Sequence, residues 1–224
     1  MRHYEIVSLD MFQTLVNVNS RIEQVWEPIL GQSYTLESAN EHARLLLEYY
    51  HVHSNQLKDL GPFYLTAEVY TRSYESVFTQ NGLTYDLQQA VQILFQEHTQ
   101  SHFYEDTIDF LNRITKKYKT CLVSDADEAM IPDFYKEYGI HAFISERYRS
   151  YKNDKHNTMF KALLKRYDVD PSKVIHIGDS VSDILGAKRE GIVACWINRE
   201  KQAWQHEVKP DMVIESFNDL VGVL

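Results

Sequence analysis

Cysteine is scarce in this sequence of 224 residues, which contains only Cys121 and Cys195. Both lie within runs of apolar and β-branched residues, and two cysteines placed in this way form neither a disulfide framework nor a metal-binding spacing. We therefore expect two buried thiols in a protein that works in the reducing cytoplasm.

Long hydrophobic runs are absent as well. No segment approaches the roughly 20 apolar residues that a membrane span requires. The N-terminal segment MRHYEIVSLD reaches an acidic residue too soon to contain the apolar region of a signal peptide. We therefore expect neither a transmembrane helix nor a signal peptide.

Positive charge is in deficit, because 23 lysines and arginines stand against 32 aspartates and glutamates, giving a formal net charge of -9. A net charge of this sign disfavours general binding to nucleic acid or to an anionic membrane. It does not oppose a local basic pocket for a small anionic molecule. The remaining composition, 44% hydrophobic and 25% charged, is typical of a soluble globular protein.

Short apolar segments recur through the second half of the chain, alternating with segments of helical spacing. Together with the N-terminal run YEIVSL they give six expected strands, at residues 4–9, 120–124, 141–145, 173–178, 192–198 and 211–215. Their apolar residues do not alternate strictly with polar ones, as is typical of strands covered on both faces. Strands that alternate with helices in this way predict a parallel α/β sheet.

The region from residue 18 to residue 99 differs from the rest of the chain. Its apolar residues recur with helical spacing, and no strand-like run interrupts them. Asn81-Gly82 marks a turn within the region. We therefore expect an all-helical domain at 18–99, inserted after the first strand of an α/β core made of 1–17 and 100–224.

Polar residues capable of chemistry stand at the expected carboxyl ends of the strands, where open parallel sheets bind their ligands. Asp10 follows the first strand, and Ser124 ends the second. Lys152 precedes a helical segment, while Asp179 and Asp183 follow the strand KVIHIG on one side of a helix start. Each residue alone is as easily explained as a helix cap or a surface residue, but their order and common placement indicate one site.

The segments DMFQTL, LVSDAD, SYKND and IGDSVSD, in this order, resemble the four motifs of the haloacid dehalogenase-like hydrolase superfamily. The resemblance covers the first strand and the residues from about 103 onward, and the helical domain stands where that family carries a helical cap. It implies a Rossmann-like core. Because most members of the family are phosphatases, it also implies hydrolysis of a small phosphorylated metabolite.

The family's phosphatase reaction uses Mg²⁺, which offsets the repulsion between an attacking carboxylate and an anionic phosphate. The resemblance implies that Asp10 is both the nucleophile, which forms an aspartyl-phosphate, and a metal ligand. It implies that the backbone carbonyl of Phe12 and the carboxylate of Asp179 are further ligands, with Asp183 in support.

By the same resemblance, Ser124 would hydrogen-bond a phosphoryl oxygen, Lys152 would balance its charge, and Thr14 would orient the loop. One position departs from the phosphatase pattern, in which a second aspartate, two residues after the nucleophile, serves as general acid and base. That residue is Phe12, which can do neither. Loss of such a group typically lowers the rate by about 10²–10⁴-fold.

Three interpretations of Phe12 are open. In the first, the protein is a phosphatase that is slow or that takes a proton from a residue of the helical domain, for which the candidates are His51, His53, Tyr49 and Tyr74. In the second, it is a 2-haloacid dehalogenase, a class that has an aromatic residue at this position and uses a cap arginine, for which the candidates are Arg44 and Arg21. In the third, the site binds a phosphorylated ligand without turnover.

Asp179 favours the first interpretation. Dehalogenases work without a metal and usually lack this aspartate, whereas its carboxylate has a clear task in a metal site. The retained nucleophile, lysine and metal-binding acids argue against a site that only binds. The sequence therefore predicts a Mg²⁺-dependent phosphatase.

Overall fold

The structure is a computed structural model that describes residues 3–224, with the side chains of all of these except Asp59 and Leu60. The chain forms two compact units. The core unit contains the N-terminal segment as far as Asn17, together with Phe103–Asp125 and Asp133–Leu224. The helical unit contains Val18–His102 and Ala126–Pro132.

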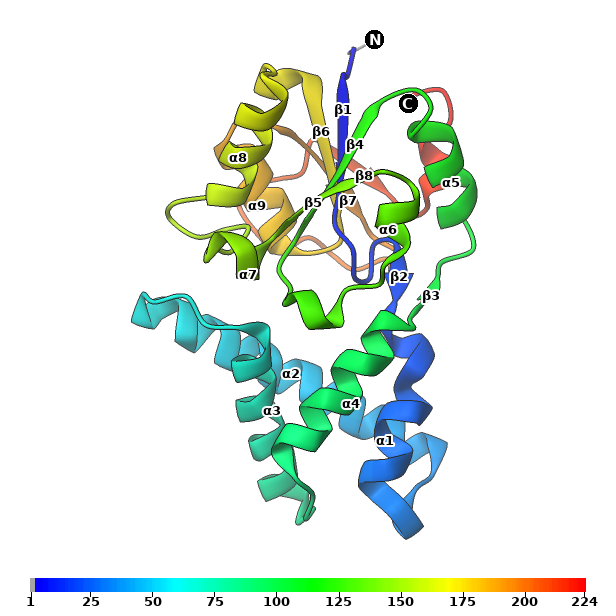
Figure 1. Cartoon of the computed structure of the whole chain (residues 1–224), viewed down its shortest axis with the longest axis vertical. Helices are drawn as coiled ribbons and strands as arrows, with labels where there is room; N and C mark the ends of the chain where they lie inside the picture. Colours follow the sequence, from blue (N-terminus) through cyan, green and yellow to red (C-terminus); the bar gives the residue numbers. More distant parts are fainter. Residues whose placement is uncertain (1–2) are drawn as a thin grey trace. The chain divides into compact units, whose positions relative to one another are not determined.

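A six-stranded parallel sheet forms the centre of the core unit (Figure 1). Its strands, in spatial order, are β5 (His141–Ile144), β4 (Lys119–Ser124), β1 (Ile6–Leu9), β6 (Val174–Gly178), β7 (Val193–Ile197) and β8 (Met212–Ile214). β1 therefore lies inside the sheet, where Leu9 is paired with both Leu122 and Ile177. The parallel α/β sheet and the six strands predicted from the sequence are confirmed.

Helices cover both faces of this sheet, which explains why every residue of β1, β6 and β7 is buried. They are α5 (Thr107–Ile114), α6 (Phe134–Glu137), α7 (Ser145–Tyr148), α8 (Thr158–Tyr167) and α9 (Val181–Arg189). Apolar side chains of α8 and α9, among them Phe160 and Ile184, form one buried cluster with strand residues. α5 lies on the opposite side of the sheet (Figure 1), where Phe110 stacks on Phe217 at a ring separation of 4.0 Å.

The helical unit consists of α1 (Ile22–Leu30), α2 (Leu36–Leu60), α3 (Thr66–Asn81) and α4 (Leu87–Thr99). The side chains of Thr35 and Asp86 cap the N-termini of α2 and α4. Gly82, in the left-handed conformation, ends α3 at the turn that the sequence indicates. In the part of the chain that the structure describes, no helix is both long enough and apolar enough to cross a membrane.

Shorter elements complete the chain. A two-stranded sheet is formed by β2 (Val16–Asn17) and β3 (His102–Phe103). Single 3₁₀ turns occupy Val18–Arg21, Gly31–Ser33, Glu128–Met130, Pro171–Lys173 and Phe217–Leu220.

The segment Ala126–Pro132 packs within the helical unit, although it directly follows β4 in sequence. Its carboxylate at Asp127 accepts hydrogen bonds from the backbone nitrogens of Thr66 at 2.9 Å and Ala67 at 2.7 Å. A carboxylate at this place satisfies free N–H groups of the first turn of α3 and complements the helix dipole. This capping interaction ties the segment to α3.

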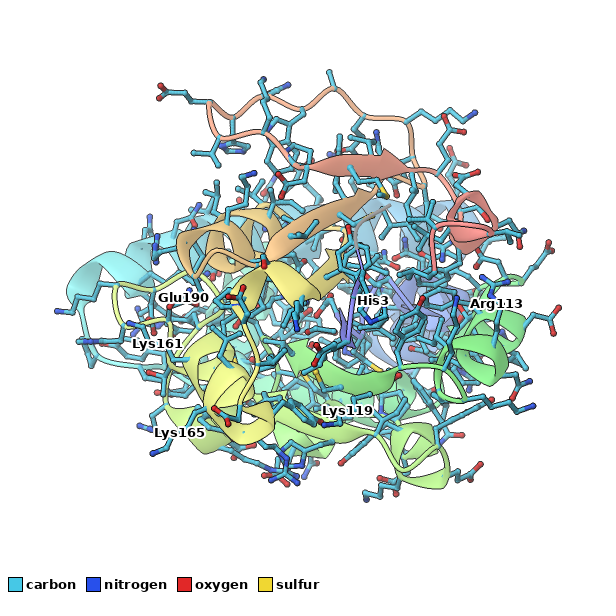
Figure 2. The ribbon with its side chains drawn as sticks, turned by 90° about the horizontal axis from the view of Figure 1, so that it is seen from above. His3, Arg113, Lys119, Lys161, Lys165 and Glu190 are labelled. Carbon is cyan, nitrogen blue, oxygen red and sulfur yellow. The ribbon has the colours of Figure 1, made fainter. Side chains whose placement is uncertain are left out.

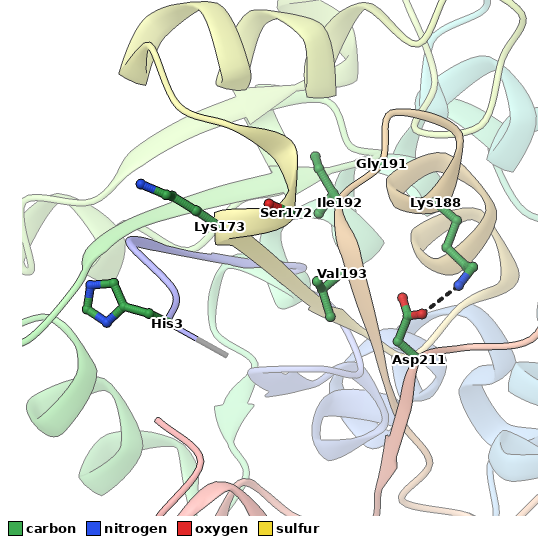
Figure 3. Close-up of a pocket in the computed structure, with 8 residues that line it drawn as sticks. All are labelled: His3, Ser172, Lys173, Lys188, Gly191, Ile192, Val193 and Asp211. Carbon is green, nitrogen blue, oxygen red and sulfur yellow. Dashed lines mark hydrogen bonds and ion pairs between the residues drawn. The ribbon is translucent and has the colours of Figure 1, made fainter. Parts of the chain in front are cut away.

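The strands all run in one direction, so their first residues share one end of the core unit. Figure 2 looks onto this end, where His3 and Lys119 are labelled. Two hollows, each of about 420 Å³, lie at this end of the core unit. Lys119 is among the residues that line the first, and Val193 is among those that line the second. In the second hollow, shown in Figure 3, Lys188 and Asp211 form an ion pair of 2.7 Å. Neither hollow contains a residue that the sequence predicts for the site.

Candidate active site

Asp10 stands where β1 leaves the centre of the sheet. Its backbone nitrogen donates to the carbonyl of Ile177 at 2.9 Å, which fixes the first residue beyond the strand. The residue is only 5% exposed, and its Oδ1 atom accepts a hydrogen bond from Lys152 Nζ at 2.8 Å. Burial raises the pKa of Asp10, and the nearby carboxylate of Asp183 adds to the rise, while Lys152 opposes it.

Lys152 lies in the loop between α7 and α8 and is 2% exposed. Its backbone nitrogen donates to Asp125 Oδ1 at 2.8 Å. A side chain at Gly186 would place Cβ 2.0 Å from the Lys152 carbonyl oxygen, so the loop can approach α9 this closely only because residue 186 is glycine. The site therefore depends on a position that carries no functional group.

The Lys152 ammonium joins two of the predicted site residues. Nζ lies 2.5 Å from Asp183 Oδ1 as well as 2.8 Å from Asp10 Oδ1, in an environment that is almost free of solvent. Burial acts to lower the pKa of Lys152, but the carboxylates of Asp10 and Asp183 outweigh it and raise this pKa well above its ordinary value. Lys152 is therefore held as a cation.

Asp179 and Asp183 follow β6, and the chain turns there into α9. Ser180 caps α9, and its backbone nitrogen and hydroxyl lie 3.0 Å and 2.5 Å from Asp183 Oδ2. Asp179 Oδ1 accepts a hydrogen bond from Thr14 Oγ1 at 3.1 Å. At Gly178 an added Cβ would lie 2.2 Å from Asp183 Cγ, so glycine is required for Asp183 to reach this position.

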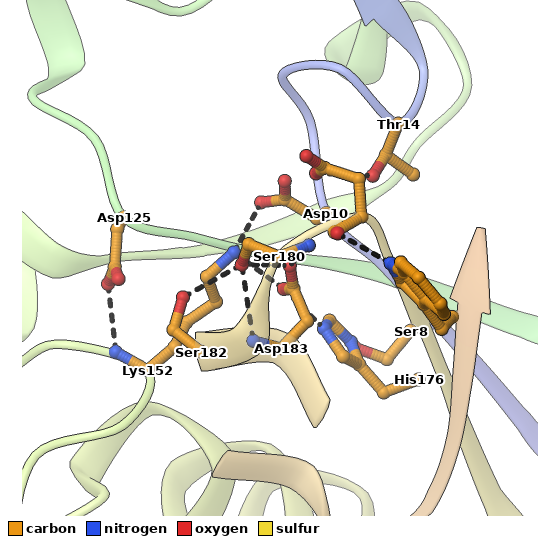
Figure 4. Close-up of polar contacts among 11 residues, drawn as sticks. Ser8, Asp10, Thr14, Asp125, Lys152, His176, Ser180, Ser182 and Asp183 are labelled. Atoms are coloured by element: carbon orange, nitrogen blue, oxygen red, sulfur yellow. Dashed lines mark hydrogen bonds and ion pairs between the residues drawn. The ribbon is translucent and has the colours of Figure 1, made fainter. Parts of the chain in front are cut away.

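Asp183 is saturated with hydrogen-bond donors (Figure 4). An ionised carboxylate offers about four acceptor positions. Oδ1 contacts Lys152 Nζ and, at 2.9 Å, His176 Nε2, while Oδ2 contacts two donors of Ser180. Although burial acts to raise it, these donors leave the pKa of Asp183 below its ordinary value, so the carboxylate stays ionised. Its task in the site is to hold Lys152.

Carboxylate oxygens of Asp10, Asp179 and Asp183 lie within 4.8 Å of one another, and among the described residues no other three such ligand side chains come this close together. One ammonium, on Lys152, cannot neutralise three carboxylates. Burial and then the charges of Asp10 and Asp183 raise the pKa of Asp179 well above its ordinary value. Oxygen donors with excess negative charge fit a divalent cation, and since Asp183 is saturated, Asp10 and Asp179 are the carboxylates available to it.

The remaining predicted residues surround Asp10. Ser124 ends β4, is 2% exposed, and its hydroxyl acts to lower the pKa of the Asp10 carboxyl. Thr14 is fully buried and contacts Asp179. Phe12 is half-buried in the turn after Asp10, and with no ionisable group in its side chain it offers only its backbone carbonyl as a ligand. The structure therefore brings Asp10, Thr14, Ser124, Lys152, Asp179 and Asp183 together in the core unit.

Two residues of this site, Ser8 and His176, were not predicted from the sequence. His176 bonds Asp183 and also lies 2.9 Å from Ser8 Oγ through Nδ1, and both residues are fully buried inside strands. The feature of the sequence that could have indicated them is the two-residue period of side chains along a strand. Ser8 and His176 stand two positions before Asp10 and Gly178, and therefore point to the same face.

The residues of the helical unit that were proposed from the sequence contact other residues of that unit, although the buried hydroxyl of Tyr74 has no hydrogen-bond partner among the described residues. Arg21 pairs with Glu97 at 2.6 Å, and Arg44 pairs with Glu48. Tyr74 is fully buried, and burial raises its pKa well above the ordinary value. Further contacts are Tyr49 with Gln80 and His53 with Ser76, and burial lowers the pKa of His51.

A sequence model of the haloacid dehalogenase-like hydrolases matches residues 4–191, which is most of the chain. The chain belongs to this family. It is therefore a hydrolase of the family that the sequence motifs indicate, and that prediction is confirmed.

One curated relative is 5-amino-6-(5-phospho-D-ribitylamino)uracil phosphatase YigB of Escherichia coli (strain K12). It is 22% identical over 125 residues, which are 54% of this chain and 52% of that protein, so the match spans about half of its length. Identity at this level supports kinship but does not transfer a substrate.

Solved structures share the fold across the whole chain. L-2-haloacid dehalogenase from Xanthobacter autotrophicus has a TM-score of 0.82 at 15% identity, with 99% of each chain covered. The putative HAD-hydrolase YfnB from Bacillus subtilis, in a form bound to magnesium, has a TM-score of 0.82 at 14% identity, again with 99% of each chain covered. At such identities the likeness shows the fold alone.

Proposed function

We propose that this protein is a Mg²⁺-dependent phosphatase that acts on a small phosphorylated metabolite, with Asp10 as its nucleophile. The observation that carries the proposal is the group of three carboxylates around a single buried lysine. A catalytic site with excess negative charge repels an anionic phosphate unless a cation is added. The match to the YigB phosphatase supports the same activity.

The residues assigned to the metal are Asp10 and Asp179 through their carboxylates and Phe12 through its backbone carbonyl. When bound there, Mg²⁺ would neutralise the excess charge and stabilise the charge that develops on the phosphoryl oxygens. Thr14, by donating to Asp179 Oδ1, directs that carboxylate. Asp183 stays bound to its four donors.

In the first half-reaction a carboxylate oxygen of Asp10 attacks phosphorus, the bond from phosphorus to the ester oxygen breaks, and the leaving alkoxide takes up a proton. Water then attacks the aspartyl-phosphate, which releases inorganic phosphate and restores Asp10. Lys152 contacts Asp10, and Ser124 stands at the end of the neighbouring strand β4, so their ammonium and hydroxyl are placed to donate to phosphoryl oxygens. Phe12 supplies no proton to the leaving group, which favours substrates with good leaving groups.

The helical unit is assigned the role of a cap that selects the substrate, with 18–99 as its main segment and the α/β core formed by 1–17 and 100–224. Lids of this kind exclude water and choose among substrates in many enzymes. The two buried thiols, Cys121 and Cys195, suit a reducing compartment, and the proposed location is the cytoplasm. No nucleic acid or membrane partner is assigned.

Phosphate release from an aryl phosphate tests the proposal. Aryl phosphates have a good leaving group and so tolerate the absence of a general acid. With Mg²⁺ we expect turnover that falls to the level of an Asp10→Asn blank when a chelator is added and returns when Mg²⁺ is restored. Turnover that is unaffected by chelation, or equal to the blank, would contradict the proposal.

Phe12→Asp is expected to raise phosphatase activity, by about 10-fold or more on an alkyl phosphate and less on an aryl phosphate. The new carboxyl supplies the general acid and base whose contribution is typically about 10²–10⁴-fold. Steady-state kcat on the two substrate types is the measurement, and Phe12→Leu, which removes the ring without adding an acid, is the matched control. Equal rates for the aspartate and leucine variants would show that another group already provides the proton.

Phe12 also favours a second function, 2-haloacid dehalogenation, because halide leaves without a proton and needs no general acid. Chloride or bromide release from 2-halopropionates, with and without chelator, separates the two functions. A phosphatase releases phosphate and no halide. Halide release that is independent of metal, together with no phosphate release, would assign the dehalogenase activity instead.

A further inference from the structure

His176 is a polar residue in the middle of a strand of the sheet, and the phosphatase mechanism above does not use it. It is fully buried, and its ring packs edge-on against Phe160 with 4.9 Å between ring centroids. A buried imidazole must find hydrogen-bond partners or destabilise the fold. Its two partners are Asp183 and Ser8, each at 2.9 Å (Figure 4).

The chemistry of these partners fixes which ring nitrogen carries hydrogen. The Asp183 carboxylate only accepts, so the contact with it requires a hydrogen on Nε2. The Ser8 hydroxyl, which can donate as well as accept, satisfies Nδ1 whether or not that nitrogen also carries hydrogen. Register in the sheet supports this arrangement, because Ser8 of β1 and His176 of β6 are directly paired. The strand pairing therefore orients the imidazole toward Asp183.

We propose that His176 is a positioning residue that acts through Asp183 to hold the Lys152 ammonium beside Asp10, an inference that rests on the proposed function of the site. Oδ1 of Asp183 receives both His176 Nε2 and Lys152 Nζ. With both donors in place the ammonium also spans to Asp10 Oδ1 at 2.8 Å. Without His176, that oxygen loses a donor and draws the ammonium away from the nucleophile.

Three variants separate this role from a contribution to folding. His176→Leu removes the donor and keeps an apolar side chain in the core. His176→Gln keeps an amide N–H that can take the place of Nε2. Phe160→Leu perturbs the packing against the same ring without touching a hydrogen bond, and serves as the matched control. Each is measured for Mg²⁺-dependent kcat and KM on an aryl phosphate and for Tm.

We expect His176→Leu to lower kcat by about 10–100-fold with little change in KM, the size of effect typical when a residue that orients a functional group is lost. His176→Gln should recover most of kcat. Phe160→Leu should lower Tm with kcat within about twofold of the unmodified protein. Equal kcat losses in the leucine and glutamine variants, tracking their Tm, would overturn the proposal.

A measurement on the unmodified protein needs neither turnover nor a variant that folds. In ¹⁵N-histidine-labelled protein without metal or substrate, the two-bond nitrogen–proton spectrum reports the tautomer of each ring. The His176 ring should carry hydrogen on Nε2, and a ring with hydrogen on Nδ1 alone would overturn the proposal. If the unmodified protein releases no phosphate, the proposed function fails, and this spectrum then decides the placement of His176 alone.

Discussion

Asp10→Asn is expected to abolish phosphate release, by at least about 10³-fold, and to leave the fold intact. The amide has nearly the shape of the carboxylate and keeps an oxygen for Lys152, but it cannot attack phosphorus to form the covalent intermediate. Catalytic residues act together, so loss of the nucleophile alone removes nearly all of the rate enhancement that they provide. Phosphate release over long incubations, with Tm measured in parallel, checks the result.

The stability of this variant carries separate information. In the folded protein, burial and Asp183 raise the pKa of Asp10, which means that its ionised form is disfavoured there. Replacing that carboxylate by a neutral amide removes one of three crowded negative charges, so Tm should not fall. Asp109→Asn, an exposed substitution on α5, is the matched control and should retain full activity. Residual turnover by Asp10→Asn that depends on Mg²⁺ would disprove the covalent mechanism.

Lys152→Met is expected to eliminate activity and to cost about 3–5 kcal/mol in the free energy of unfolding, as is typical when one partner of a buried ion pair is removed. The Lys152 side chain is 3% exposed and its ammonium contacts two carboxylates, so its loss leaves three crowded carboxylates without a balancing cation. Urea denaturation followed by circular dichroism measures the change. Added Mg²⁺ should restore part of the lost stability, because it supplies positive charge to the same oxygens.

Two further variants make this result specific. Lys161→Met removes a lysine side chain that is 57% exposed and whose ion pair with Glu190 is long, at 3.8 Å. The free energy of unfolding of this variant should differ from that of the unmodified protein by no more than about 0.5 kcal/mol. The double variant Lys152→Met/Asp183→Asn removes a negative charge along with the positive one and should be more stable than Lys152→Met alone. If the double variant lost as much stability as the two single variants added together, crowding of the carboxylates would not be the reason that Lys152→Met is unstable.

Much of the core unit could be predicted from the sequence, for a physical reason. Each strand is an apolar run bounded by polar residues, and strands buried on both faces need no finer pattern than that. Because parallel strands end at one edge, the residues that follow them meet there. Asp10, Ser124 and Asp179 could therefore be placed together from the sequence.

Other features depend on contacts that local sequence does not encode. His176 looks like one polar interruption in an apolar strand, and its role appears only when β6 is paired with β1. The capping of α3 by Asp127 joins residues more than 60 positions apart, so the sequence gives no sign that 126–132 packs with the helical unit. Which side chain replaces the missing acid at Phe12 depends on tertiary packing in the same way, and it stays a prediction to be tested.

The position of β1 has a consequence for how the protein is made. β1 leaves the ribosome before either of its neighbours in the sheet, since Lys119 begins β4 and Val174 begins β6, both far downstream. Throughout synthesis of the intervening chain, this largely apolar strand has two unpaired edges, which is the condition under which nascent chains associate wrongly. Asp10 is thus translated long before its surroundings are complete, and a chain truncated before β6 would carry Asp10 without an enzyme around it.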